Sequence, residues 1–175
     1  MGVLSAATLY GAAHQQPQEF QIVTEAVLRP AAAGRTRLHF LYKKKLAQTP
    51  TERIKTETGS MAVSTPEATA VDLVRYPHAA GGIGNVVTVL SELAERLDAD
   101  RLLQAAAAEA ALAAAQRLGL LLDRAGGADK TGPLAEWIEQ RRPRAVPLRP
   151  NVDAEGRPRD SRWRVFVNET IEVDE

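Results

Sequence analysis

The amino-acid sequence predicts an α+β fold in which helices pack on one side of a mainly antiparallel sheet. Alternating apolar and polar residues, the pattern of β-strands, occur in residues 19–63 and return in residues 162–173. Apolar residues at three- and four-residue spacing, the pattern of amphipathic helices, occupy residues 65–142. Because strands and helices are segregated along the chain, we expect this fold rather than alternating strand–helix–strand units with a parallel sheet. The length of 175 residues suits a single domain, residues 1–175.

The first third of the chain predicts one helix followed by strands. Residues 4–13 are rich in alanine, and Pro17 would end a helix there. Residues 31–34 look like the turn between the first two strands. Alternation predicts strands that cover residues 20–24, 38–42, 54–56 and 61–63.

Helical signals dominate the middle of the chain. Ser64 and Glu67 have the spacing of a capping box, so we expect a helix to begin there. A second helix begins near Ile83. Asp98 is a suitable cap for a third helix, and the periodicity extends this helix without a break over residues 99–124.

The last third predicts a short helix over residues 133–142 and a mobile loop over residues 150–161, which are rich in proline, glycine and charge. Trp163, Val165 and Val167 then alternate in a final strand. We expect that strand to join the N-terminal sheet, because its three apolar side chains otherwise have nothing to cover them.

Composition and charge exclude several classes of protein. The chain has no cysteine, which excludes disulfide scaffolds, thiol nucleophiles and cysteine-ligated zinc and suits a cytoplasmic protein. No apolar run is long enough to span a membrane. The net charge is zero, which argues against a dedicated, highly basic nucleic-acid binder. Residues 1–60 nevertheless hold eight Lys or Arg and four Asp or Glu, an excess of four positive charges.

This N-terminal basic excess marks the candidate nucleic-acid-binding residues. They are Arg35, Arg37, Lys43, Lys44 and Lys45. Side chains of this kind contact phosphates without reading base sequence. The alternative is an edge strand whose lysines prevent strand-to-strand aggregation.

Residues that could carry catalysis are scarce. His14, His39 and His78 are scattered, so we expect no metal site and no cofactor. A nuclease of the restriction-endonuclease type needs an acid two positions before its lysine, and the strand at residues 40–45 has none there. Asp72 lies in an apolar helical run, and we interpret it as a cap or an ion pair with Arg75.

Two glycine-rich segments resemble ligand loops only superficially. Gly126 and Gly127 precede Lys130 and Thr131, but a helix precedes them and Asp129 stands directly before the lysine. A helix C-terminus explains that segment better. Residues 81–85 open a helix whose N-terminal amides could hold an anion, or they form a plain turn.

An ordered set of short motifs resembles the C-terminal region of AbiEi-type antitoxins, from the abortive-infection, type IV toxin–antitoxin systems. The motifs are Leu4–Ala7 with Gly11–His14, Ser64–Thr69 with Asp72–Val74, Gly81–Gly82, Arg117–Gly119 with Leu121–Leu122, and Arg162–Trp163 with Asn168. The resemblance implies a non-enzymatic protein that neutralises a nucleotidyltransferase-like toxin and represses its own operon. It also implies that the winged helix-turn-helix usual at the N-terminus of such proteins is absent from this chain.

The resemblance therefore names a cognate toxin as the partner and operator DNA as a second, weaker one. It supplies no catalytic residues. Two alternatives stay open: a degraded nuclease or nucleotide-binding enzyme, supported by the glycine loops and the lysines, and a structural remnant without a partner.

Overall fold

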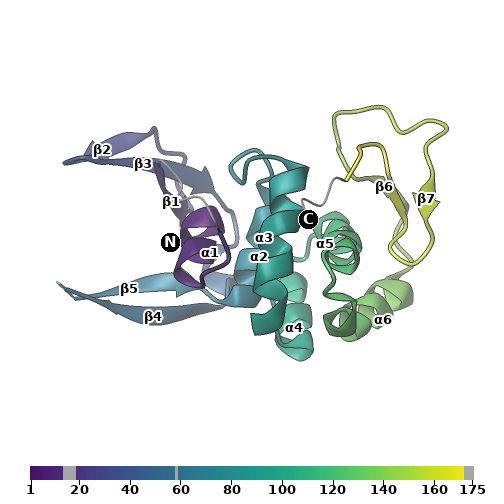
Figure 1. Cartoon of the computed structure of the whole chain (residues 1–175), viewed down its shortest axis with the longest axis horizontal. Helices are drawn as coiled ribbons and strands as arrows, with labels where there is room; N and C mark the ends of the chain where they lie inside the picture. The colour runs from purple at the N-terminus through teal and green to yellow at the C-terminus, as the bar shows by residue number, and fades with distance from the viewer. Residues whose placement is uncertain (14–18, 58, 172–175) are drawn as a thin grey trace.

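The protein has a helical body with strands at both ends (Figure 1). The structure is a computed structural model, and it describes residues 1–13, 19–57 and 59–171. His14 and Pro17, singled out from the sequence, lie outside the described residues. Two β arms project from one side of the body, and a small C-terminal sheet lies on the opposite side (Figure 1).

The first arm is a three-stranded sheet in the order β1-β3-β2. Its strands are β1 (Glu19–Thr24), β2 (Ala31–Ala33) and β3 (Thr36–Tyr42). Strand β1 runs parallel to β3, whereas β2 is antiparallel to it. The segment expected to be a turn is thus mostly strand β2, and the turn itself is formed by Gly34, with φ 61°, and Arg35.

The second arm is an antiparallel hairpin formed by the two strands predicted near residues 54–56 and 61–63. Strand β4 (Thr51–Thr56) pairs with β5 (Gly59–Ser64), so both strands are longer than the sequence pattern indicated. A short 3-10 helix, η1 (Leu46–Gln48), connects the two arms.

The helical body contains six α-helices, within the described residues, and two short 3-10 helices. They are α1 (Val3–Leu9), α2 (Pro66–Arg75), α3 (Ile83–Leu93), η2 (Ala94–Arg96), α4 (Ala99–Glu109), α5 (Leu112–Arg124), η3 (Ala128–Lys130) and α6 (Gly132–Arg141). One core cluster joins them and extends into the C-terminal segment. Fully buried members include Val3, Leu73, Leu90, Leu121 and Trp163.

Helix α2 begins one residue later than the capping box predicted. The hydroxyl of Thr65, not of Ser64, accepts the Ala68 amide at 3.3 Å. Ser64 instead bonds the Thr69 hydroxyl at 2.7 Å inside the core. Glu67 is buried and accepts the backbone amide of Asp98 at 3.2 Å, so it joins two helices rather than closing its own.

The single helix expected over residues 99–124 is wrong. Asp98 caps α4 as predicted, through the Arg101 amide at 2.9 Å. At Ala110 the backbone turns left-handed, with φ 51°, and α5 begins two residues later. The break separates two helices that both pack on α2 and α6, and α5 also packs on α3. Alanine has the strongest helix propensity, so the sequence pattern gave no sign of the interruption.

The C-terminal strand does not join the N-terminal sheet, and that prediction was also wrong. Strand β8 (Val165–Phe166) lies between β6 (Val146–Pro147) and β7 (Arg159–Asp160), parallel to the first and antiparallel to the second. The cover for Trp163 and Val165 comes from the helical body, since α5 contacts β8. The α+β class is confirmed, with antiparallel-rich pairing spread over three small sheets.

Candidate functional site

The five basic residues singled out from the sequence do not form one group. Arg35 is exposed at the tip of the first arm, in the β2–β3 turn. Arg37 lies on β3, where its Nε is 3.3 Å from Oε1 of its cross-strand neighbour Glu19. Lys44 and Lys45 are exposed beyond the other end of β3. At about 3.3 Å per strand residue, they lie roughly 20 Å from Arg37.

Lys43 is not at the surface. Its side chain has no exposed area, and its Nζ lies 2.7 Å from Oδ1 of Asp72 and 2.5 Å from Oε1 of Glu109. The alternative of an edge strand that carries the three lysines is also wrong, because β3 ends at Tyr42 and lies between β1 and β2. In this arrangement the Lys43 ammonium lies between two buried carboxylates and is not available to a phosphate.

The ion pair expected between Asp72 and Arg75 is replaced by a larger network. Arg75 NH1 pairs with Oε2 of Glu109 at 3.1 Å, and Asp72 turns to Lys43 instead. Asp72 Oδ2 is buried and has no hydrogen-bond partner among the described residues. Burial raises the pKa of Asp72 above its usual value, Lys43 opposes that shift, and Glu109 adds to it.

This buried network fixes the first arm to the helical body. It joins the segment after β3 to α2 and α4, and the Tyr76 hydroxyl donates to the Tyr42 carbonyl at 2.7 Å beside it. The end of β3 nearest the body is therefore held at several points, while the tip near Arg35 projects freely (Figure 1). A restriction-endonuclease-type nuclease would carry an acid on the same strand as its lysine. Here the two acids beside Lys43, Asp72 and Glu109, come from helices α2 and α4.

A second polar cluster attaches the C-terminal sheet to the body. Asp123 on α5 accepts Trp163 Nε1 at 2.6 Å and Arg162 NH1 at 3.0 Å on one carboxylate oxygen, and the Thr131 hydroxyl at 2.9 Å on the other. The Trp163 ring lies against Gly119, where any Cβ would overlap it. These contacts explain why glycine and tryptophan occupy those positions.

Asn168 organises the long loop that precedes β7. Its Nδ2 donates to the carbonyls of Arg149 and Val152 at 2.9 and 2.8 Å, and its Oδ1 accepts the Arg149 amide at 2.9 Å. One buried side chain therefore holds Val152, within the loop predicted to be mobile, and Arg149, directly before that loop.

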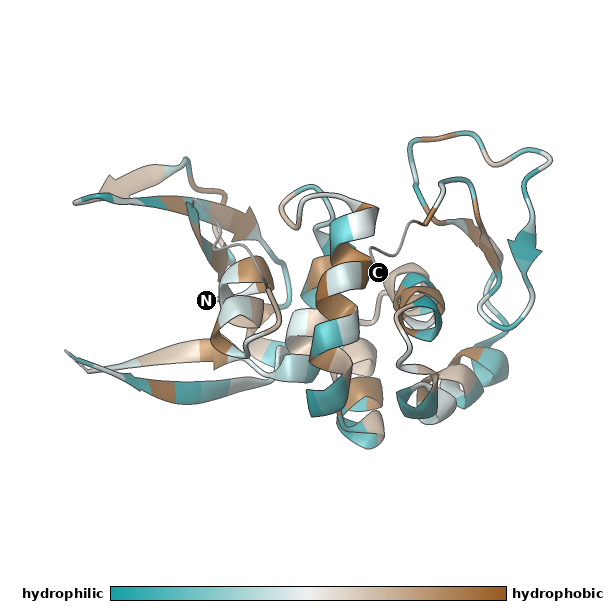
Figure 2. Ribbon diagram, viewed as in Figure 1, coloured by the Kyte–Doolittle hydropathy of each residue, from teal (hydrophilic) through white to brown (hydrophobic). Residues whose placement is uncertain are grey.

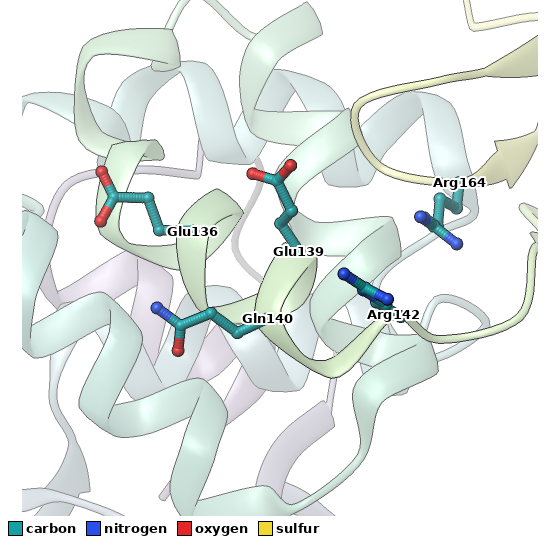
Figure 3. A pocket seen from close by; sticks show the side chains of 5 residues that line it. All are labelled: Glu136, Glu139, Gln140, Arg142 and Arg164. Atoms are coloured by element: carbon teal, nitrogen blue, oxygen red, sulfur yellow. The ribbon is translucent and has the colours of Figure 1, made fainter.

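A cavity with a volume of about 620 Å³ lies beside α6 (Figure 3). It is lined by Glu136, Glu139, Gln140, Arg142 and Arg164. The two arginines have left-handed backbones, with φ 44° and 54°. Helix termination accounts for the first, because the Arg142 amide donates to the carbonyls of Ile138 and Glu139. The cavity is open to solvent and lined by charged and polar side chains, and it lacks the apolar walls usual in small-molecule sites.

The remaining candidates from the sequence have structural roles or isolated positions. Gly126 has φ 85°, and the Gly127 amide donates to the Leu122 carbonyl at 2.8 Å, so this segment ends α5 as predicted. His39 lies 3.5 Å from Glu19, and His78 is exposed in a loop. Across residues 1–13, 19–57 and 59–171, no three His, Asp or Glu side chains gather as a metal site. In the same part of the chain, no helix is long and apolar enough to cross a bilayer.

Comparison with known families identifies the chain. Residues 1–124 match the family described as the AbiEi antitoxin C-terminal domain. The match places the protein among the components of toxin–antitoxin systems. Within that class, it belongs to the AbiEi antitoxin C-terminal domain family, as the ordered motifs predicted. The motif residues Arg162, Trp163 and Asn168 lie beyond the matched range.

Among solved structures, the chain is similar to the RV2827C protein from Mycobacterium tuberculosis, with a TM-score of 0.62 and 16% sequence identity. The match covers 94% of this chain and 60% of that chain, so this chain spans less than two thirds of the solved relative. At this identity the likeness shows the fold alone. No curated protein matches the chain.

Proposed function

We propose that this protein is a non-enzymatic antitoxin that binds and neutralises a nucleotidyltransferase-like toxin. The observation that carries the proposal is the family match over residues 1–124, a range that contains both β arms and helices α1 to α5. The proposal includes a cytoplasmic location, because a chain without cysteine suits a reducing compartment.

The geometry supports a binding role more than a catalytic one. The grouping of Lys43, Asp72 and Glu109 resembles a nuclease site in residue types, but each of these side chains is at most 4% exposed. Substrate cannot reach groups that the core already covers. The arms, in contrast, present exposed backbone and side chains on an anchored base, which suits association with another protein.

Co-expression with the product of the neighbouring gene tests the antitoxin role. We expect the neighbouring protein to arrest growth when expressed alone, the pair to restore growth, and the two chains to co-purify. Absence of both rescue and complex would refute the proposal. Release of nucleotides or cleavage of nucleic acid by this purified chain would support the enzymatic alternative instead.

We also propose that operator DNA is a second partner, contacted through phosphates by the exposed Arg35, Arg37, Lys44 and Lys45. The support for this proposal is that these four side chains are exposed. Lys43 is excluded because it is buried. An electrophoretic shift at ~150 mM salt, where exposed charges are screened within about 8 Å, tests this partner. Each lost phosphate contact should lower the salt slope by about 0.9. No shift with wild-type protein would leave DNA without a role.

A further inference from the structure

We propose that the outer edge of β2, with Val27 and Leu28 beside it, binds an extended segment of the toxin that carries apolar and acidic side chains and adds a strand to the first arm. This inference rests on the proposed antitoxin function and specifies where the toxin docks.

The free edge of β2 is the first observation. Strand β2 is the last in the order β1-β3-β2, and within the described residues no strand pairs with its outer side. All three of its residues are exposed alanines. An unpaired strand edge offers backbone donors and acceptors to an incoming strand, and small side chains leave room for large ones from the partner.

Exposed apolar side chains next to this edge are the second observation. Val27 is 85% exposed and Leu28 is 48% exposed, in the segment that leads into β2. Figure 2 shows apolar colour on this segment and on β2, at a distance from the helical core. Neighbouring exposed apolar residues of this kind often mark an interface, and a partner strand along β2 would cover them.

Charge supplies the third observation and the chemistry of the partner. Arg29 and Arg35 flank β2 at its two ends, both exposed, and neither forms an ion pair with any described residue. Arg37, opposite Ala32 in the ladder, already pairs with Glu19. Acidic side chains at the ends of an incoming strand would therefore complement Arg29 and Arg35, and would steer its approach.

The anchoring of β3 makes this edge a prepared surface. Strand β3 lies between β1 and β2, and the residue after it, Lys43, is tied to α2 and α4 through Asp72 and Glu109. A strand held in this way loses little freedom when a partner binds, which favours association.

Binding of the purified neighbouring toxin, measured by calorimetry, tests the inference with two kinds of variant. The double variant V27S/L28S alters only exposed side chains, so it should fold normally and weaken toxin binding about tenfold or more. The matched control is Val152→Ser, because Val152 is also exposed, at 37%, but lies in the C-terminal loop. It should bind as wild type does.

Proline substitutions test the backbone edge itself. Proline at Ala31, Ala32 or Ala33 removes one amide donor at a time. A proline that removes an amide facing β3 disturbs the pairing of β2 with β3 and should lower the melting temperature. A proline that removes an amide on the outer side of β2, called an outward substitution here, should leave the melting temperature unchanged. An outward substitution should lower toxin affinity about tenfold while the melting temperature is retained.

The outcomes distinguish this inference from the function on which it rests. If wild type binds and neutralises the toxin but V27S/L28S and the outward proline variants do so equally well, the edge is not the docking site and the antitoxin role stands. If wild type neither binds nor neutralises the toxin, the antitoxin function and the docking site on β2 are both refuted. If R29E/R35E abolishes DNA binding and leaves toxin affinity unchanged, the arm is a nucleic-acid surface and the inference is overturned.

Discussion

Three consecutive lysines in this chain occupy two different environments. Lys43 is enclosed between Asp72 and Glu109, whereas Lys44 and Lys45 face solvent. The sequence showed a basic run and could not separate its members, because the two acids come from helices that lie far along the chain. Asp72 itself, an acid within an apolar helical run, was the one signal that a buried cation was needed.

Replacing Lys43 by methionine should destabilise the protein strongly. The change would leave the buried Asp72 carboxylate without its cation and Glu109 with Arg75 alone, and breaking a buried ion pair in this way typically costs about 3–5 kcal/mol. The neighbouring exposed change Lys44→Met should alter the free energy of unfolding by less than about 0.5 kcal/mol. Urea denaturation of the two variants provides the comparison, and equal effects would contradict the buried network.

The stability contributed by Asp72 should depend on pH in the direction opposite to that of an ordinary ion-paired carboxylate. Burial raises its pKa above 3.8, so the folded protein keeps this proton at pH values where the unfolded chain has lost it. The contribution is fully present below pH 3.8 and is lost as pH rises through the folded pKa.

Asp72→Asn isolates that contribution, because asparagine does not titrate and can still accept a bond from Lys43. The free energy of unfolding of wild type minus that of the variant should fall as pH rises above 3.8, by at most about 1.4 kcal/mol per pH unit. Urea titrations at several pH values measure the difference. A difference that grows with pH would mean that Lys43 lowers the pKa instead.

At the scale of elements, the sequence predicted the helices and strands better than their partners. The hairpin β4–β5, the helix starts near Ile83 and Asp98, and the end of α5 at Gly126 follow from local signals. The break at Ala110 and the pairing of β8 with β6 do not. Both are decided by packing between distant segments, for which alternation and helical periodicity carry no information.

Gly119 shows how one residue can join two elements. It lies on α5 under the Trp163 ring, and a Cβ there would overlap that ring. Gly119→Ala should therefore destabilise the protein by about 1–3 kcal/mol through overpacking, although alanine favours helices. In Gly132→Ala the new Cβ meets no neighbour, so stability should change by less than about 0.5 kcal/mol. Thermal melting ranks the two variants, and the opposite order would show that the ring moves aside freely.

At the scale of the whole molecule, the arms and the body differ in how they are stabilised. The core cluster runs from Val3 in α1 through the helices to Val165 in β8, so the C-terminal sheet shares the core of the body. The β arms add few fully buried side chains, chiefly Val63, and the Lys43 network fixes the base of the first arm. The surfaces available to a partner are therefore attached to the core without being part of it.

Continuity of the core predicts that residues 1–175 unfold as one domain, although the family match ends at residue 124. Both tryptophans, Trp137 on α6 and Trp163 beside β8, lie beyond that point, so their fluorescence reports the C-terminal part. Far-ultraviolet circular dichroism reports mainly the helices, most of which lie before it. Because Trp163 is fully buried against Gly119 and bonded to Asp123, the two signals should give the same urea midpoint and slope. An earlier fluorescence transition would instead define residues 125–175 as a separate unit that docks on the antitoxin domain.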